Sequence, residues 1–254
     1  MPKTLTASDR SALIRLASEL PKGDETRKAI LAGLSKASGL GRKVNMIGTH
    51  ILGDAQVKDS ATVFEKATVS DNAKVYGDAS VFGNAQVSDR AKVGDNAQVY
   101  DNALVYGSAL VTQEAEVFDY AKVSGNSKVF GNGKVFGSAK VFGNAEVSEN
   151  AKVLDRAKVL DDAKVYGDAQ LRATAKVYGN AKVYGSALVI GGFVGENAQV
   201  FGKAKVSGFT FIVGNAKIGG TAEILGGEWN GSEGEVLEGK WSSPGVPAKE
   251  FNFA

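Results

Sequence analysis

Few residues in this chain of 254 could carry acid–base or nucleophilic chemistry. His50 is the single histidine, and cysteine is absent. An imidazole titrates near neutral pH, so His50 is the one candidate for an imidazole general base. Without cysteine the chain has neither thiol catalysis nor disulfides. No glycine-rich phosphate loop and no cluster of metal-binding residues stands out in the sequence.

The element that must position His50 is a six-residue repeat, which runs unbroken from Ala55 to Gly192. The run consists of 23 consecutive hexads with the pattern Ala-x-Val-x-(Gly/Asp)-(Asn/Asp/Ser). Position one departs from Ala only at Ser127 and Gly133, and position three departs from Val only at Leu171. A fixed short period of this kind is typical of a solenoid.

The unit predicts a short β-strand followed by a corner. Alternation places positions one and three on one face and positions two and four on the other. Gly and Asn at the corner tolerate the positive φ that a sharp bend needs. A helix would need apolar residues near every 3.6 positions, and a pentapeptide coil would need a period of five. A flat hairpin meander would leave an Ala/Val face uncovered, whereas winding the chain closes that face into a core.

The units resemble the hexapeptide repeat of left-handed parallel β-helices, aliphatic-x-x-x-small-x, as at 57–62 and 81–86. The resemblance covers about 55–226 and implies triangular, left-handed coils that are each built from three hexads. Aromatic residues recur at position four with a spacing of 18, which independently supports that coil length. After Val189 the frame slips by one residue and then continues to Ile224. We therefore expect an all-β solenoid, a left-handed triangular parallel β-helix of about nine to ten coils.

Three segments are expected. Residues 1–43 form an α-helical hairpin over 6–38 with a link at 39–43, either a cap on the first coil or a docking segment. Its Leu-Pro-Lys-Gly segment at 20–23 resembles the short helical leaders of tailed-phage virion proteins. Residues 44–226 form the β-helix. Residues 227–254 form a C-terminal cap whose large apolar side chains are Trp229, Trp241, Phe251 and Phe253. Within this tail, 244–249 resembles the Gly-x-Pro-Ala-Lys segment of hexapeptide acyltransferases, or is a plain surface turn.

The resemblance raises an enzymatic hypothesis. Hexapeptide acyltransferases use a histidine as general base, with acyl-CoA lying between neighbouring subunits. His50 would occupy position two of the first, imperfect hexad, which points outward near the end of the rod, and the 23 regular hexads contain no extruded loop to build a pocket. Carbonic anhydrases of this fold need three zinc-binding histidines, which one histidine excludes. The expectation is therefore no enzyme, no cofactor and no metal, with an acyltransferase based on His50 as the alternative.

Two outward columns are predicted at the 18-residue spacing. An aromatic column at position four comprises Phe64, Phe82, Tyr100, Phe118 and Phe136, continued by Leu154. It is either an exposed stripe that binds a partner or a self-stacking support for the rod. A second column consists of Lys122, Lys140, Lys158 and Lys176, whose like charges Asp155, Asp161, Asp162 and Asp168 can offset. This column suits a solvated face better than a nucleic-acid groove.

Composition agrees with a structural role. The formal net charge is +2, which calls for neither nucleic acid nor membrane, and no apolar run reaches membrane length. No signal peptide is evident, so synthesis in the cytoplasm is expected, with incorporation into a virion as an option. The hypothesis is a rigid non-enzymatic rod that presents faces to other subunits, as a homotrimer and with other structural proteins in a virion or filament. A scaffold that binds a host or envelope partner is a third option.

Overall fold

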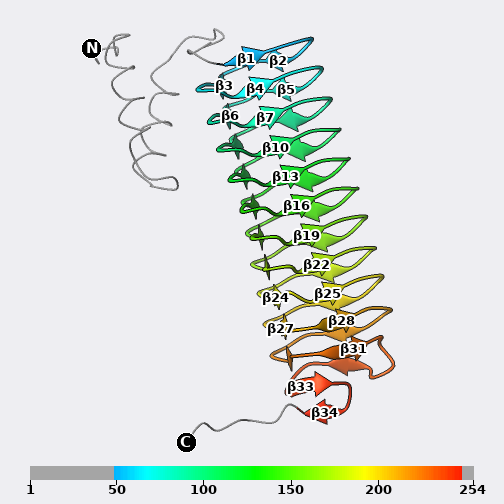
Figure 1. Ribbon diagram of the computed structural model, residues 1–254. Helices are drawn as coiled ribbons and strands as arrows, with labels where there is room; N and C mark the ends of the chain where they lie inside the picture. Colours follow the sequence, from blue (N-terminus) through cyan, green and yellow to red (C-terminus); the bar gives the residue numbers. More distant parts are fainter. Residues whose placement is uncertain (1–48, 248–254) are drawn as a thin grey trace, which may run out of the picture. The chain divides into compact units, whose positions relative to one another are not determined.

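The computed structural model describes residues 49–247, and every regular element in this range is a β-strand. In the regular hexads, positions two and three form a two-residue strand and positions five and six form the turn. Three hexads close one triangular coil, and the coils stack on one another (Figure 1). The helical hairpin predicted for 6–38 and its link at 39–43 lie outside the described residues.

The strands of successive coils pair into three sheets. Sheet A contains β1 (His50–Ile51), β4 (Thr68–Val69), β7 (Gln86–Val87), β10 (Leu104–Val105), β13 (Lys122–Val123), β16 (Lys140–Val141), β19 (Lys158–Val159), β22 (Lys176–Val177), β25 (Phe193–Val194), β28 (Thr210–Ile212) and β31 (Gly227–Trp229). Sheet B contains β2 (Gln56–Val57), β5 (Lys74–Val75), β8 (Lys92–Val93), β11 (Leu110–Val111), β14 (Lys128–Val129), β17 (Glu146–Val147), β20 (Lys164–Val165), β23 (Lys182–Val183), β26 (Gln199–Val200), β29 (Lys217–Ile218) and β32 (Glu235–Val236). Sheet C contains β3 (Thr62–Val63), β6 (Ser80–Val81), β9 (Gln98–Val99), β12 (Glu116–Val117), β15 (Lys134–Val135), β18 (Lys152–Val153), β21 (Gln170–Arg172), β24 (Leu188–Ile190), β27 (Lys205–Ser207), β30 (Glu223–Ile224), β33 (Lys240–Ser243) and β34 (Val246–Pro247), the last antiparallel to β33.

Each coil supplies one strand to each sheet, so the described residues form eleven coils, where the sequence predicts nine or ten. The coils extend past residue 226, because β31, β32 and β33 continue the parallel pairing in the segment expected to be a cap. The repeat is hidden there because Trp229 pairs with Ile212 and Trp241 with Ile224, so tryptophan stands where Val is expected. The expected parallel three-sheet solenoid is confirmed, and it is longer than predicted.

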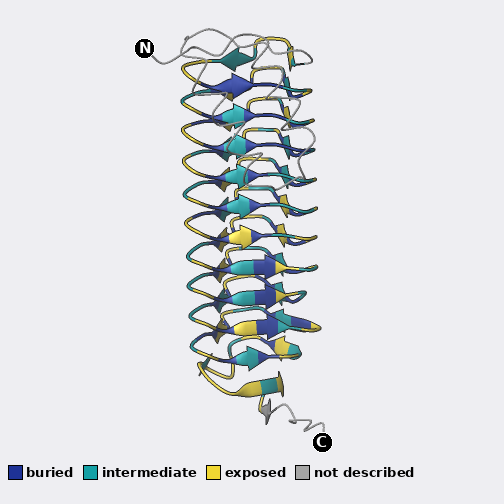
Figure 2. Cartoon of the chain, turned by 90° about the vertical axis from the view of Figure 1, so that its left-hand side faces the viewer, coloured by how far each residue is buried: buried dark blue, intermediate teal, exposed yellow. Residues whose placement is uncertain are grey.

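The core is a stack of the residues at positions one and three, as the alternation predicts. From Ala67 to Ile224 the Ala, Val, Leu and Ile side chains at these positions are buried, with exposed fractions of 0–1%. In Figure 2 dark blue buried segments recur in successive coils, and yellow exposed corners separate them within a coil. Ser127, which replaces Ala at position one, satisfies its hydroxyl by donating to the Ser124 carbonyl at 2.7 Å. The Ser127 hydroxyl in the apolar core therefore has a hydrogen-bond acceptor.

The corners bend at position five, where φ is positive in every hexad from Gly53 to Gly191. Gly and Asn were expected to adopt this conformation, but in the structure Gly and, for the most part, acidic residues adopt it. Positive φ is unfavourable for residues with a Cβ, and here a hydrogen bond between coils offsets that cost. The Asp89 Oδ2 atom accepts the backbone N–H of Gly107 at 2.8 Å, and Asp161 Oδ2 accepts that of Gly179 at 3.0 Å.

Asparagine instead occupies position six, where its side-chain amide bonds to the next coil. The Asn126 amide donates to Asn144 Oδ1 at 3.1 Å, and Asn144 donates to Asp162 Oδ1 at 2.9 Å. Asn132, Asn150 and Asp168 repeat the arrangement on another edge. These amide ladders tie successive corners together, in addition to the strand hydrogen bonds.

The expected slip after Val189 is confirmed. Lys176 pairs with Phe193, so this coil is one residue shorter than the regular coils, and the Lys176 N–H donates to the Gly192 carbonyl, where other coils use Ala. Gly192 therefore stands at position one, and Phe193 is moved to the outward position two. An added Cβ on Gly192 would lie 2.9 Å from Val206 Cγ1, so the close approach of two coils favours glycine there.

Candidate interaction surfaces

The predicted aromatic column lies at the corner that follows sheet C. Phe64, Phe82, Tyr100, Phe118 and Phe136 form one continuous stack, with ring centroids 4.8–4.9 Å apart and planes within 4° of parallel. The spacing follows the separation of neighbouring strands, because each ring projects from the same position of its coil. Leu154 continues the column, and Arg172 ends it. The sequence therefore predicted the alignment of these residues correctly.

The rings of the aromatic column are less exposed to solvent than the sequence predicts for an exposed stripe. Phe64, Phe82 and Tyr100 are buried, with exposed fractions of 8%, 4% and 3%, whereas Phe118 and Phe136 are half-buried. The expectation of an uninterrupted exposed stripe is therefore wrong for the first three rings. Stacking removes both faces of each inner ring from solvent. At least one outer edge is covered as well, because Tyr100 Oη donates to Glu116 Oε2 at 3.0 Å.

Glu116 links the column to the outward row of sheet C. Its Oε1 atom accepts from Lys134 Nζ at 2.6 Å, so the carboxylate bridges Lys134 and Tyr100. Burial, together with the Glu116 carboxylate, raises the pKa of the Tyr100 phenol far above its usual value. The phenol therefore stays protonated and remains a hydrogen-bond donor. Half-buried Phe118, Phe136 and Leu154 are the part of the column that a partner could still reach.

A second aromatic column, which the sequence analysis missed, lies at the corner that follows sheet B. Tyr166 stacks on Tyr184 at 5.0 Å, and Tyr184 stacks on Phe201 at 5.4 Å. The column ends at Gly219, where an added Cβ would lie 2.3 Å from the Phe201 ring. The 18-residue spacing of Tyr166 and Tyr184 was a usable signal, but the slip shortens the next spacing by one and obscures the column.

A third aromatic group stands at the slip and was also missed. Phe193 and Phe211 are neighbours in sheet A and stack at 4.9 Å. Phe209 approaches both rings edge-on, at 6.4 and 5.0 Å, and is 76% exposed. Unlike the two columns, this group leaves a phenylalanine largely in solvent.

The predicted lysine column is confirmed as an outward row of sheet A. Lys122, Lys140, Lys158 and Lys176 are consecutive partners in the parallel pairing. Within residues 49–247 these four lysines form no salt bridge. The four aspartates expected to offset them bond to other corners instead, to the amides of Ala173, Gly179, Asn144 and Asn150. Among the described residues, this row of like charges therefore has no directly paired carboxylate. The Nζ atom of Lys176 lies 4.9 Å from the Tyr178 ring centroid.

His50 lies in β1, the first strand of sheet A, and is exposed, as its outward position predicts. Its strand partner is Thr68, and in the described part of the chain no other residue forms a side-chain hydrogen bond with it. The described residues contain no group of three or more His, Asp or Glu side chains placed to hold a metal ion. Neither observation gives His50 an orienting carboxylate of the kind that a general base uses.

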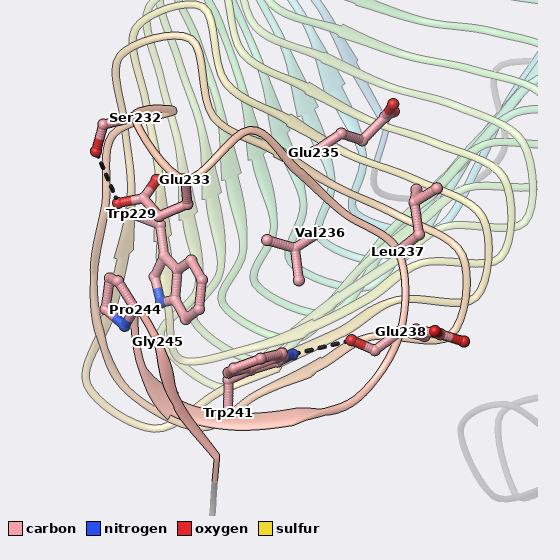
Figure 3. A pocket seen from close by; sticks show the side chains of 10 residues that line it. All are labelled: Trp229, Ser232, Glu233, Glu235, Val236, Leu237, Glu238, Trp241, Pro244 and Gly245. Atoms are coloured by element: carbon pink, nitrogen blue, oxygen red, sulfur yellow. Dashed lines mark hydrogen bonds between the residues drawn. The ribbon is translucent and has the colours of Figure 1, made fainter.

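A cavity of about 650 Å³ opens at the C-terminal end of the core (Figure 3). Trp229 and Trp241 meet edge-on at 6.4 Å, and their indole N–H groups donate to the carbonyls of Gly226 and Glu238, each at 2.9 Å. Val236 and Pro244 also line it. Because both indole donors are satisfied by the backbone, the tryptophans close the last coils rather than offer donors to a ligand.

Comparison with known proteins supports the repeat architecture alone. A family model described as YdcK Beta solenoid repeat matches residues 97–113. This is a short part of the chain, so it agrees with a β-solenoid repeat without assigning a function. No curated protein matches the chain. Within the described residues, no helix is long and apolar enough to cross a bilayer.

Proposed function

We propose that this chain is a non-enzymatic structural subunit, a rigid β-helical rod that presents its long faces to other subunits of a virion or filament. The observation that carries the proposal is the in-register stacking of outward side chains over successive coils. Such rows repeat at the strand spacing and give a partner a straight, preformed surface. A preformed surface loses little conformational entropy on binding, which suits an assembly role.

The half-buried end of the first aromatic column is the part of this rod best suited to side-on contact. Phe118, Phe136 and Leu154 combine apolar surface with rigidity, because the two rings are already fixed by stacking. Similar β-helical rods pack as trimers through their flat sides, so three copies are the favoured assembly, and docking to a different structural protein is the alternative. Both remain proposals.

A single charge placed on this column tests the proposal. Phe136→Lys is expected to weaken self-association, or binding to the native partner, as measured by sedimentation equilibrium. Phe142→Lys is a matched control, because Phe142 occupies position four of the next hexad and is also half-buried, but lies at a different corner. Circular dichroism should show that both variants keep the β-solenoid. If Phe136→Lys and Phe142→Lys associate like the wild type, the column only stabilises the rod.

The enzymatic alternative has its own test. Under the structural proposal, His50→Ala leaves both fold and assembly unchanged, because His50 is exposed on the first strand. Acetyl transfer from acetyl-CoA by the purified chain, abolished by His50→Ala, would contradict the structural proposal. Glutamine at the same position would then separate loss of the base from loss of the side-chain volume.

A further inference from the structure

An exposed apolar patch, here the C-terminal patch, lies at the slip in the hexad pattern and in the two coils that follow it. It consists of Ile190, Phe193, Phe209, Phe211 and Leu225. Phe209 is 76% exposed, and Ile190 and Leu225 are each 39% exposed. Ile190 and Leu225 belong to the corner between sheets C and A, and Phe193 and Phe211 point outward from sheet A. Large apolar side chains gathered in this way are typical of a surface that is covered by a partner.

The charges that border the patch indicate which partner covers it. In sheet A, Lys176 pairs with Phe193, Phe193 with Phe211, and Phe211 with Glu228. The outward row therefore reads positive, aromatic, aromatic, negative across four consecutive coils. Such a row is complementary to itself when it is reversed. A second copy that runs in the opposite direction would place lysine opposite glutamate at both ends, with the aromatic rings between them.

We propose that the C-terminal patch binds a second copy of this chain, with sheet A of one rod facing sheet A of the other and the two rods antiparallel. The two-fold axis would run along the strand direction, between the levels of Phe193 and Phe211. This arrangement is isologous, because both copies use the same residues. It deepens the proposed structural role, on which it rests, by naming the partner as a second copy.

The geometry of packed sheets allows the paired charges to meet. Facing sheets pack about 10 Å apart, which a lysine and a glutamate side chain together can span. The same symmetry exchanges the levels of two successive coils, so Phe209 of one copy comes to the level of the Ile190 corner of the other. Because the overlap covers only four coils, we expect a small interface and a dissociation constant in the micromolar range.

Charge reversal gives a direct test of the proposal. Lys176→Glu alone, or Glu228→Lys alone, sets like charges against each other at both ends and should weaken association about tenfold. The double variant, with both changes in one chain, should associate like the wild type. A mixture of the two single variants should also associate, because each new charge then faces an opposite charge. Sedimentation equilibrium between about 1 and 200 µM covers the expected range.

The controls separate this contact from folding and from the rest of the lysine row. Lys122→Glu changes the same row three coils away and should leave association unchanged. Phe209→Ser should weaken association while leaving the thermal unfolding midpoint unaltered, because its ring is mostly in solvent. The proposal is overturned if the wild type stays monomeric at about 200 µM, or if the two single variants fail to associate when mixed. In that event the binding of Phe136→Lys to the native partner, rather than its self-association, still decides the proposed structural role by itself.

Discussion

Residues 55–189 and residues 190–243 build the same three sheets but treat their aromatic side chains differently. In the first region every coil is three hexads long, and rings at one position stack on rings of the same position. In the second region, the slip shortens a coil by one residue, and Phe209 projects into solvent. Rings at position four cover one another in register, whereas a ring at position six, such as Phe209 or Tyr120, stays largely exposed. Partner contact is proposed in both regions, at the half-buried end of the first column and at the C-terminal patch.

The largest expected effect is on the core of the regular region. Val123→Asp places an unpaired carboxylate in a wholly buried apolar stack and should cost about 4 kcal/mol or more. Val236→Asp, in the last coil, should cost less than half as much, because Val236 is half-buried and borders the end cavity. Urea unfolding followed by circular dichroism measures both. Equal losses would show that the terminal coils are as tightly packed as the middle ones.

An intermediate effect should distinguish a stacked ring from a projecting one. Phe118 lies between Tyr100 and Phe136, so Phe118→Ala removes two stacking contacts and should cost about 2 kcal/mol. Phe209→Ala should change the unfolding free energy by less than about 0.5 kcal/mol, because the ring is mostly exposed. Thermal unfolding of the two variants at one low protein concentration makes the comparison. The contrast between the two regions fails if Phe209→Ala is the more damaging change.

The smallest effect concerns two carboxylates, each placed between lysines of adjacent coils. Lys164 and Lys128 lower the pKa of Glu146 in the regular region, and Lys205 and Lys240 lower that of Glu223 near the C-terminal end. A carboxylate whose pKa is lowered in the folded state stabilises the fold fully at pH values above its ordinary pKa of 4.5. This stabilisation is lost as the pH falls through the pKa of the folded state. Because the lysines are half-exposed, we expect the ion pairs of Glu146 to contribute about 0.5 kcal/mol to the free energy of unfolding at pH 7.

The pH dependence can be checked with neutral variants. Glu146→Gln should be slightly less stable than the wild type at pH 7, and the two proteins should converge near pH 3, where the carboxylate is protonated. Glu223→Gln should show a weaker form of the same behaviour, since its carboxylate is more exposed. If the free energies of unfolding of the wild type and Glu146→Gln differ by the same amount at low pH as at pH 7, the variant has lost packing rather than charge pairing.

The sequence predicted the sheets and the core because both depend on a local rule. Val and Ala recur at fixed positions, and an 18-residue aromatic period sets the length of a coil. The last coils were missed because Trp229 and Trp241 replace the aliphatic residues that define the rule. The pattern placed Asp at position five, but its positive φ was not predicted. Asp89 is stabilised in that conformation by an amide of the next coil, and this partner is known only once the coils are stacked.

The aromatic surfaces were predicted in part. The spacing of the first column gave its alignment, but exposure depends on what surrounds each ring, such as the contact of Tyr100 with Glu116. The slip at Gly191 and Gly192 moves Phe193 outward, and this part of the C-terminal patch was not predicted. Phe209 and Phe211 stand at outward positions of hexads that keep the frame, so the pattern contained a signal for them that was not used.

The uniform coil has a consequence for how such a chain can change over generations. A coil in the regular region is complete in three hexads and pairs only with the coil on either side of it. Duplicating or deleting one coil therefore alters the distance between the two ends by one strand spacing, about 4.8 Å, and leaves the surfaces of the other coils as they were. The length of the solenoid can therefore change in steps of three hexads while the residues at its two ends stay the same.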